Sequence, residues 1–278
     1  MFGFNEDVLS ALVVPAGLPP WHGAARAATV HVGHSLCLLR RPDGVLLPVT
    51  GGDHGLVPGG VLVPEPAEFA ALSAAAARGE LDLARLRSAR AIETRELRVR
   101  PGRLRPAAAR LALARLAGQQ PVPQWRLAGG LVRALADPDR RELASRLAEL
   151  VGSGPGSTPA GDDIVLGVLA VLHRRGPAAE APRLAIGESL PGLLRRTTMT
   201  SRHLLAAALD GLVADRVHQV LAGLSEADAV PGLLSSARGW GATSGLDLVT
   251  GAASAILGTQ RMFSAGRSGE VEQEERVA

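Results

Sequence analysis

The chain has 278 residues, of which 46% are hydrophobic, and its formal net charge at pH 7 is only +3. These values are typical of a globular protein with one large or two modest domains, and so small a positive excess does not indicate nucleic-acid binding. All 30 basic residues are arginine, so mechanisms that need a lysine Schiff base or a P-loop lysine are excluded.

Three further features limit the class of protein. Cys37 is the only cysteine, which excludes an intrachain disulfide and a cysteine-rich metal site. The central apolar run, residues 164–172, is much shorter than the ~20 residues of a membrane span. Glu6 and Asp7 stand where a secretory signal carries basic residues. We therefore expect a cytoplasmic protein that has no membrane partner.

The N-terminal part has the pattern of a β-rich domain. Residues 29–63 are short apolar runs separated by Gly, Pro and Asp, which predicts short strands joined by turns. Residues 66–77 have helical composition after a proline, and residues 91–100 return to a strand-like mixture. Residues 100–106 are rich in Pro, Gly and Arg and are interpreted as a connector. We predict an α+β fold that begins with a small, barrel-like β-rich domain over residues 1–104.

The rest of the chain predicts a mostly α-helical domain over residues 105–262. Leucine and alanine recur there with helical spacing. The predicted helices cover residues 107–117, 140–151, 159–175, 198–212 and 245–257. The tail, residues 263–278, has few apolar residues and is predicted to be disordered.

The richest motif is GSGPGSTPAGDD, residues 152–163. Its glycines, which include Gly154 and Gly156, allow backbone amides to approach a ligand closely. With Thr158 as the N-cap of the next helix, the free amides of that helix and of Ser157 could converge on a phosphate or a carboxylate. The alternative is purely structural, a helix end and a turn followed by a helix start.

Asp162 and Asp163 lie in the first turn of the predicted helix. Carboxylates gain about 0.3–1 kcal/mol there from the helix dipole, which is a sufficient structural reason for both. Because adjacent helical residues diverge by about 100°, we expect that they do not both face the core and that one points toward the glycine-rich loop. That carboxylate would repel phosphate unless a divalent cation such as Mg²⁺ or a ligand amide lay between them. We assign no metal ligand, since His31, His34 and His54 are too scattered for one site.

Two later segments have a similar character. Arg195 and Arg196 precede the hydroxyl residues Thr197, Thr198 and Ser201. Arginine binds carboxylates and phosphates through paired hydrogen bonds, although an exposed arginine pair followed by an ordinary helix cap explains the same run.

The second of these segments is GWGATSGLDLVTG, residues 239–251. Ser244 and Asp247 have the spacing of a capping box, which is a structural alternative to a binding role. The glycines and the aspartate repeat the spacing of the first motif, with Gly161, Asp163 and Gly167 matched by Gly245, Asp247 and Gly251.

We predict that the three segments meet at one pocket for a small anionic substrate. The predicted catalytic residues are Asp162, Asp163 and Arg196. The predicted anion-binding residues are Gly154, Gly156, Ser157, Thr158, Arg195, Thr197, Thr198, Ser201, Ser244, Gly245 and Asp247.

Residues 152–163 resemble the G-x-G-P-G-x-T-P-x-G-D-D hallmark of the AllH-like proteins, a family that includes a subunit of bacterial oxamate carbamoyltransferase. The R-T-T block at 196–198, with Ser201, and the T-S-G-x-D element at 243–247 are also similar, whereas Ala242 stands where a more polar residue is expected. The resemblance implies carbamoyl transfer between carbamoyl phosphate and oxamate in the catabolism of allantoin-derived ureides, by a hetero-oligomeric enzyme with other subunits.

The sequence lacks the S-T-R-T phosphate signature of aspartate and ornithine carbamoyltransferases, so this chemistry would use a different site. The amides of residues 154–158 would hold phosphate, Arg195 or Arg196 a carboxylate, and Asp162 or Asp163 the carbamoyl amide. The alternative function is a non-catalytic module that binds or senses a small anion.

Overall fold

Short runs rich in leucine and valine form most strands of one sheet, while two of its strands are more polar. The computed structural model describes residues 9–16, 27–79, 81, 83–87, 89–118, 122–137 and 140–275. Its strands are β1 (Leu12–Pro15), β2 (Ala28–Val32), β3 (Leu36–Arg40), β4 (Leu46–Gly51), β5 (Val61–Val63) and β6 (Ile92–Arg95). They lie in the order β2-β3-β4-β5-β1-β6.

The sheet is open, so the predicted barrel is wrong. Strands β2, β3 and β4 pair antiparallel, while β4 with β5 and β1 with β6 pair parallel. Helix α1 (Pro66–Ala77), which confirms the helix predicted over 66–77, packs Phe69 and Leu72 into a core with the strands. Because a helix covers the apolar face, the sheet does not need to close on itself. Of the two edge strands, β2 is partly exposed and β6 is largely exposed.

The two faces of the sheet follow the two-residue period of a strand. Leu12 and Val14 belong to the larger core, while Val13 packs with Leu62 and Leu97 in a smaller cluster. A short helix, α2 (Ala84–Arg87), completes the regular elements described in this part of the chain.

The chain divides into two compact units, and the boundary is not a single point. The first unit comprises Met1–Arg98 and Val213–Arg216, and the second comprises Val99–Leu212 and Val217–Ala278. The short return segment is held in the first unit by Asp215, whose carboxylate accepts hydrogen bonds from the Leu56 amide (2.9 Å) and from Arg95 Nη1 (2.7 Å). The predicted division into domains 1–104 and 105–262 stays a prediction.

The second unit is helical, as predicted. Its helices are α3 (Pro106–Leu116), α4 (Val122–Ala134), α5 (Arg140–Leu150), α6 (Ala160–Arg175), α7 (Glu180–Leu193), α8 (Met199–Leu209), α9 (Asp215–Gly223), α10 (Val230–Arg238) and α11 (Ser244–Glu275). The first two residues of α9 belong to the first unit. Short 3-10 turns are η1 (Gly176–Ala179), η2 (Leu194–Arg196) and η3 (Ala227–Ala229).

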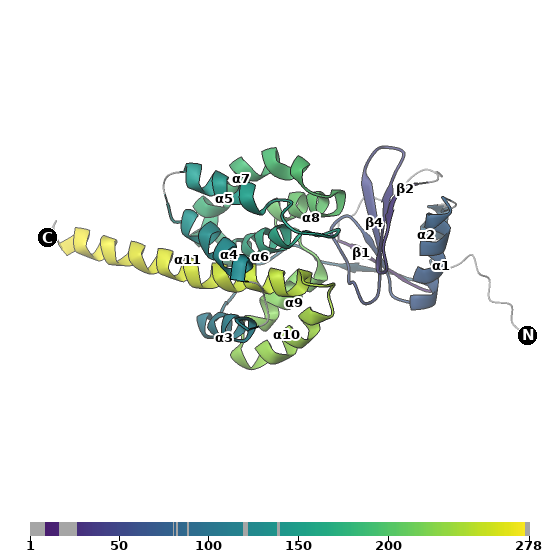
Figure 1. Ribbon diagram of the computed structural model, residues 1–278. Helices are drawn as coiled ribbons and strands as arrows, with labels where there is room; N and C mark the ends of the chain where they lie inside the picture. Colours follow the sequence, from purple (N-terminus) through teal and green to yellow (C-terminus); the bar gives the residue numbers. More distant parts are fainter. Residues whose placement is uncertain are drawn as a thin grey trace, which may run out of the picture. The chain divides into compact units, whose positions relative to one another are not determined.

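Helix α6 is the centre of this unit. Every residue from 161 to 173 is buried, and α6 packs against α4, α5, α7, α8 and α11 (Figure 1). Helix α11 extends to Glu275, which includes part of the tail over 263–278 that composition predicts to be disordered. The disorder of this tail stays a prediction. Among the described residues, no helix combines the length and the apolar character that crossing a membrane requires.

Candidate functional site

The loop between α5 and α6 takes a backbone path that requires glycine. Gly152, Gly154 and Gly156 have φ angles of 80°, 112° and 92°, in the left-handed region that other residues rarely adopt. A Cβ at Gly152 would also collide with the carbonyl oxygen of Arg196. At Gly156 nothing lies within 4 Å of such a Cβ, so only its φ demands glycine. Residues 154–157 are exposed, which leaves this stretch of backbone accessible to a ligand.

Asp162 fastens this loop to the segment before α8. Its Oδ1 accepts a hydrogen bond from the Gly152 amide (2.8 Å), and the Thr197 hydroxyl donates to Oδ2. The aspartate is only 2% exposed. Both oxygens therefore already have protein donors, which leaves Asp162 poorly placed to bind a substrate.

Asp163 is also buried, with 7% exposed, so the expectation that only one of the two aspartates faces the interior is wrong. The reason is that α6 has packed neighbours on all sides and offers no solvent face. Asp163 hydrogen-bonds to the hydroxyl groups of Ser244 and Thr158, while its Oδ2 has no hydrogen-bond partner among the described residues. Burial raises the pKa of Asp163 well above its usual value; the two hydroxyl groups oppose this, and the negative charges of Asp247 and Asp162 add to it.

Thr158 and Ser244 join the first motif to the last. Their hydroxyl oxygens lie 2.8 Å apart, and either can be the donor. The predicted N-cap role of Thr158 is wrong, because Pro159 occupies that position and makes no side-chain cap bond. The predicted capping box of Ser244 with Asp247 is also wrong, since α11 begins at Ser244 and its hydroxyl is turned toward Thr158.

Asp247 is the second buried carboxyl group of the site, with 1% exposed. Burial raises the pKa of Asp247 to about 6, against an opposing hydrogen bond from the Thr243 hydroxyl. Its charge acts on Asp163, so the starts of α6 and α11 place two buried carboxyl groups within electrostatic reach of each other. Sequence analysis did not single out Thr243 as a partner of Asp247.

The repeated glycine spacing has a structural explanation. A Cβ at Gly167 on α6 would collide with the carbonyl oxygen of Leu248 on α11, and a Cβ at Gly251 on α11 would collide with that of Ile164 on α6. Leu248 and Ile164 hold the same place in the repeat, three residues after its first glycine. The two helices thus cross through matching residues, as in a local two-fold repeat, and the crossing brings Asp163 and Asp247 together. Gly245 is needed for a similar reason, because a Cβ there would collide with the end of α10.

The arginine-hydroxyl segment contributes to the same region. Thr198 is the N-cap of α8 and accepts a hydrogen bond from the Ser201 amide (3.1 Å), which confirms the capping interpretation. Its hydroxyl also donates to the Ser157 carbonyl (2.6 Å). Arg195 and Arg196 are exposed in η2.

The predicted meeting of the three segments is confirmed by contacts of the other two with the glycine-rich segment, whereas the common pocket stays a prediction. Thr158 contacts Ser244, Ser157 contacts Thr198, and Asp162 contacts Thr197. The ligand-binding and catalytic roles of these residues stay predictions.

The histidines considered in the sequence as metal ligands belong to the first unit. In the first unit, His54 Nδ1 lies 3.2 Å from the Ser35 hydroxyl, and burial, with the nearby positive charge of Arg216, lowers the pKa of His54 to about 3. His31 and His34 are largely exposed. The part of the chain that the structure describes contains no group of three His, Cys, Asp or Glu residues arranged to hold a metal ion.

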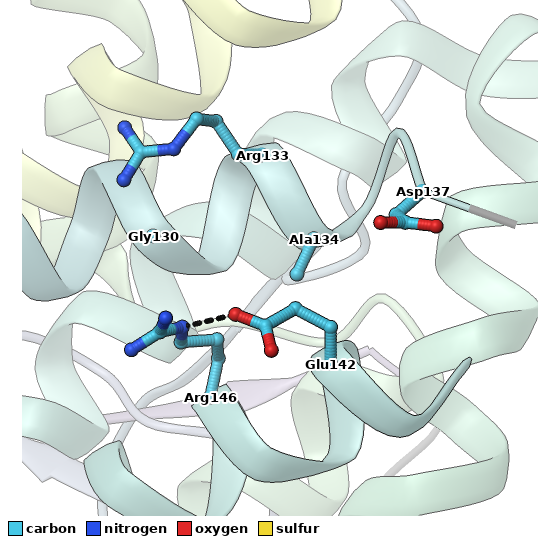
Figure 2. Close-up of a pocket in the computed structure, with 6 residues that line it drawn as sticks. All are labelled: Gly130, Arg133, Ala134, Asp137, Glu142 and Arg146. Atoms are coloured by element: carbon cyan, nitrogen blue, oxygen red, sulfur yellow. Dashed lines mark hydrogen bonds and ion pairs between the residues drawn. The ribbon is translucent and has the colours of Figure 1, made fainter. Parts of the chain in front are cut away.

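A cavity of about 430 Å³ lies between α4 and the start of α5. In Figure 2, Arg133 and Arg146 project from these two helices, and Arg146 donates a hydrogen bond to Glu142 (2.7 Å). Arg146 also pairs with Glu149 (2.9 Å), so its charge is already balanced. Sequence analysis singled out none of these residues, although the i, i+4 spacing of Glu142 and Arg146 predicts their ion pair.

Fold and site together define a mixed helix-and-sheet protein whose helical unit holds a buried carboxyl pair beneath a glycine-rich loop. Residues 150–256, less than half of the chain, match the family model described as oxamate carbamoyltransferase subunit AllH. The AllH resemblance predicted from the sequence is thereby confirmed for the segment that contains all three motifs. Comparison with curated proteins and with solved structures gives no match.

Proposed function

We propose that this chain is a subunit of an oxamate carbamoyltransferase-like enzyme that acts, together with other subunits, on carbamoyl phosphate and a small carboxylate in ureide and purine catabolism. The observation that carries the proposal is the buried, partly unsatisfied Asp163 beneath an exposed glycine-rich loop, in a segment that matches the AllH family.

The exposed backbone of residues 154–157 is the proposed phosphate site. Pro155 has no N–H, so the donors of this stretch are the N–H groups of Gly154, Gly156 and Ser157. Amides of a loop with left-handed glycines can surround an anion, and the start of α6 adds the positive end of its dipole. Because its raised pKa favours a protonated Asp163, this carboxyl group need not repel phosphate. The loop can therefore accept the anion with or without Mg²⁺.

Arg195 and Arg196 are proposed to bind the carboxylate of the acceptor. Both are exposed, and the Arg196 carbonyl packs against Gly152 at the start of the loop. The backbone of Arg196 thus lies next to the start of the loop. Paired hydrogen bonds from arginine suit a carboxylate such as that of oxamate.

In the proposed reaction the amide nitrogen of oxamate attacks the carbonyl carbon of carbamoyl phosphate. A C–N bond forms, the C–O bond to phosphate breaks, and phosphate leaves with the electron pair. The nitrogen must also lose one proton to a base. Holding both reactants in one orientation contributes strongly to such a two-substrate step.

Calorimetry with oxamate tests the carboxylate site. Arg196→Ala should weaken oxamate binding about 10- to 100-fold, as expected for the loss of a charge-assisted hydrogen bond of about 1.5–3 kcal/mol. Arg126→Ala, at an exposed position on α4, is the matched control and should bind normally. Equal affinity of both variants and the wild type would remove Arg196 from the site. Oxamate and phosphate binding without phosphate release from carbamoyl phosphate in the assembled enzyme would favour the non-catalytic alternative.

A further inference from the structure

The two hydroxyl groups that join the motifs connect the loop to the carboxyl pair. Thr158 and Ser244 are half-buried, and both hydrogen-bond to Asp163 and to each other. Thr158 belongs to the glycine-rich loop, whereas Asp163 lies beneath it with 7% exposed. A ligand in the loop can therefore reach Thr158 directly and Asp163 through the hydroxyl groups.

The protons of Thr158, Ser244 and Asp163 allow two arrangements of the hydrogen bonds among these three residues. A hydroxyl has one proton to donate and two lone pairs to accept with. If Asp163 is protonated, it donates to Ser244, Ser244 donates to Thr158, and the Thr158 proton can turn from Asp163 to a ligand oxygen. If Asp163 is ionised, Ser244 donates to Asp163 and Thr158 donates to Ser244 or to Asp163, so that Thr158 presents a lone pair to a ligand N–H. The protonation of one buried carboxyl group thus sets whether the loop offers a donor or an acceptor.

We propose that Thr158, Ser244 and Asp163 form a reversible proton relay that recognises the carbonyl and N–H groups of a small amide or carbamoyl ligand. The relay rests on the proposed function, because it adds the base that carbamoyl transfer requires. Thr158 is the residue that touches the ligand, while Asp163 and Asp247 are positioning residues. The unpartnered Oδ2 of the buried Asp163 is the feature that packing alone leaves unexplained.

Carbamoyl phosphate binds while Asp163 is protonated, and the transfer step begins after Asp163 has released that proton to solvent. As the acceptor nitrogen forms its bond to the carbamoyl carbon, its proton passes to Thr158 Oγ1, the Thr158 proton to Ser244 Oγ, and the Ser244 proton to the Asp163 carboxylate. The C–O bond to phosphate breaks, and phosphate takes that electron pair. Asp163 is then protonated again, which restores the state that binds carbamoyl phosphate.

Asp247 sets the pH at which the relay changes direction. The charged groups that act on Asp163 are Asp247 on α11 and Asp162 on α6. Asp162 is held by Gly152 and Thr197, whereas Asp247 occupies the matching position on the crossing helix. A negative Asp247 keeps the proton on Asp163 to higher pH than burial alone does.

The protein without ligand tests the relay independently of any substrate. Carbon-13 NMR of aspartate carboxyl groups should show that Asp247→Asn lowers the pKa of Asp163 by about one unit or more. Ser244→Ala should raise that pKa, because the ionised form loses a hydrogen-bond donor. The control Ser235→Ala, on the exposed face of α10, should leave it unchanged. An Asp163 pKa that is the same in all of these proteins would overturn the relay.

Oxamate and oxalate form a matched pair of ligands, because oxalate lacks the amide N–H. Calorimetry across the pH range should show that oxamate binds more tightly as Asp163 ionises and that oxalate does not. Thr158→Val should abolish this difference, while Thr158→Ser should keep it. A pH profile shared by oxamate and oxalate, or retained in Thr158→Val, would overturn the relay. If oxamate does not bind the wild type at any pH, the proposed substrate is wrong, and the NMR titration alone decides the relay.

Discussion

Asp162 and Asp163 are identical neighbours in the sequence and perform different tasks in the structure. Asp162 accepts hydrogen bonds from Gly152 and Thr197, whereas Asp163 keeps an unpartnered oxygen. The motif that contains them could be recognised in the sequence, and the contact of the three segments could be predicted from it. Their division of labour could not, because it depends on which groups the loop and the segment before α8 bring within reach.

The two aspartates should therefore respond differently to the same substitution. Asp162→Asn should lower the free energy of unfolding by about 1.5–3 kcal/mol, since hydrogen bonds to a charged group are lost. Asp163→Asn should shift the melting temperature by only a few degrees and abolish ligand binding or activity. Urea unfolding and calorimetry measure the two effects, with Glu188→Gln, at an exposed position on α7, as the control.

Each of the two substitutions has an outcome that would contradict the role assigned to its aspartate. An Asp163→Asn protein that unfolds would make Asp163 structural. An Asp162→Asn protein as stable as the Glu188→Gln control would show that the loop does not depend on the Asp162 tie.

At the scale of whole elements, composition predicts the helices that are continuous in leucine and alanine. Helices α3, α5 and α6 begin and end within two residues of their predicted bounds. Helices α4, α7, α9 and α10 were not predicted. Helix α7 contains Pro191, and α4 contains Gly129 and Gly130. Such residues normally indicate the end of a helix, but both helices continue through them. Packing around α6 overrides these local preferences, and that packing cannot be read from a single segment.

The crossing of α6 and α11 gives a test of this packing. Gly167→Ala should lower the free energy of unfolding by about 1–3 kcal/mol or more, because overpacking a close helix contact forces the backbones apart. At Gly187, also within a helix, nothing lies within 4 Å of an added Cβ, so Gly187→Ala should raise stability by about 0.5–1 kcal/mol. Thermal unfolding of the two variants should give shifts of opposite sign. A neutral Gly167→Ala would argue against the close crossing.

At the scale of the whole molecule, the two units should respond to acid in opposite ways. His54 in the first unit has its pKa lowered to about 3, so its folded form prefers the neutral ring. Stability from this group is complete above the unfolded pKa of about 6.5 and is lost on acidification, by about 2 kcal/mol at pH 5. Asp247 in the second unit has its pKa raised to about 6. Its contribution is present below about pH 3.9 and is lost as the pH rises through 6, by about 3 kcal/mol in total.

Hydrogen exchange, corrected for the intrinsic effect of pH, measures both units in one sample. Between pH 7 and pH 5, protection should fall in peptides from the first unit and rise in peptides from the second. His54→Gln should remove the first change and Asp247→Asn should reduce the second. Parallel changes in both units would contradict the assignment of the response to His54 in the first unit and to the pair of Asp163 and Asp247 in the second.

The return segment Val213–Arg216 has a consequence for how this protein can be divided into fragments. A fragment that ended near residue 98 would contain Arg95 and Leu56 without the carboxylate of Asp215 that binds them both. The first unit therefore cannot be cut out intact at a single junction. The segment that matches the AllH family model, residues 150–256, likewise carries four residues of the other unit within it, so a fragment with those bounds would take Asp215 away from Arg95 and Leu56.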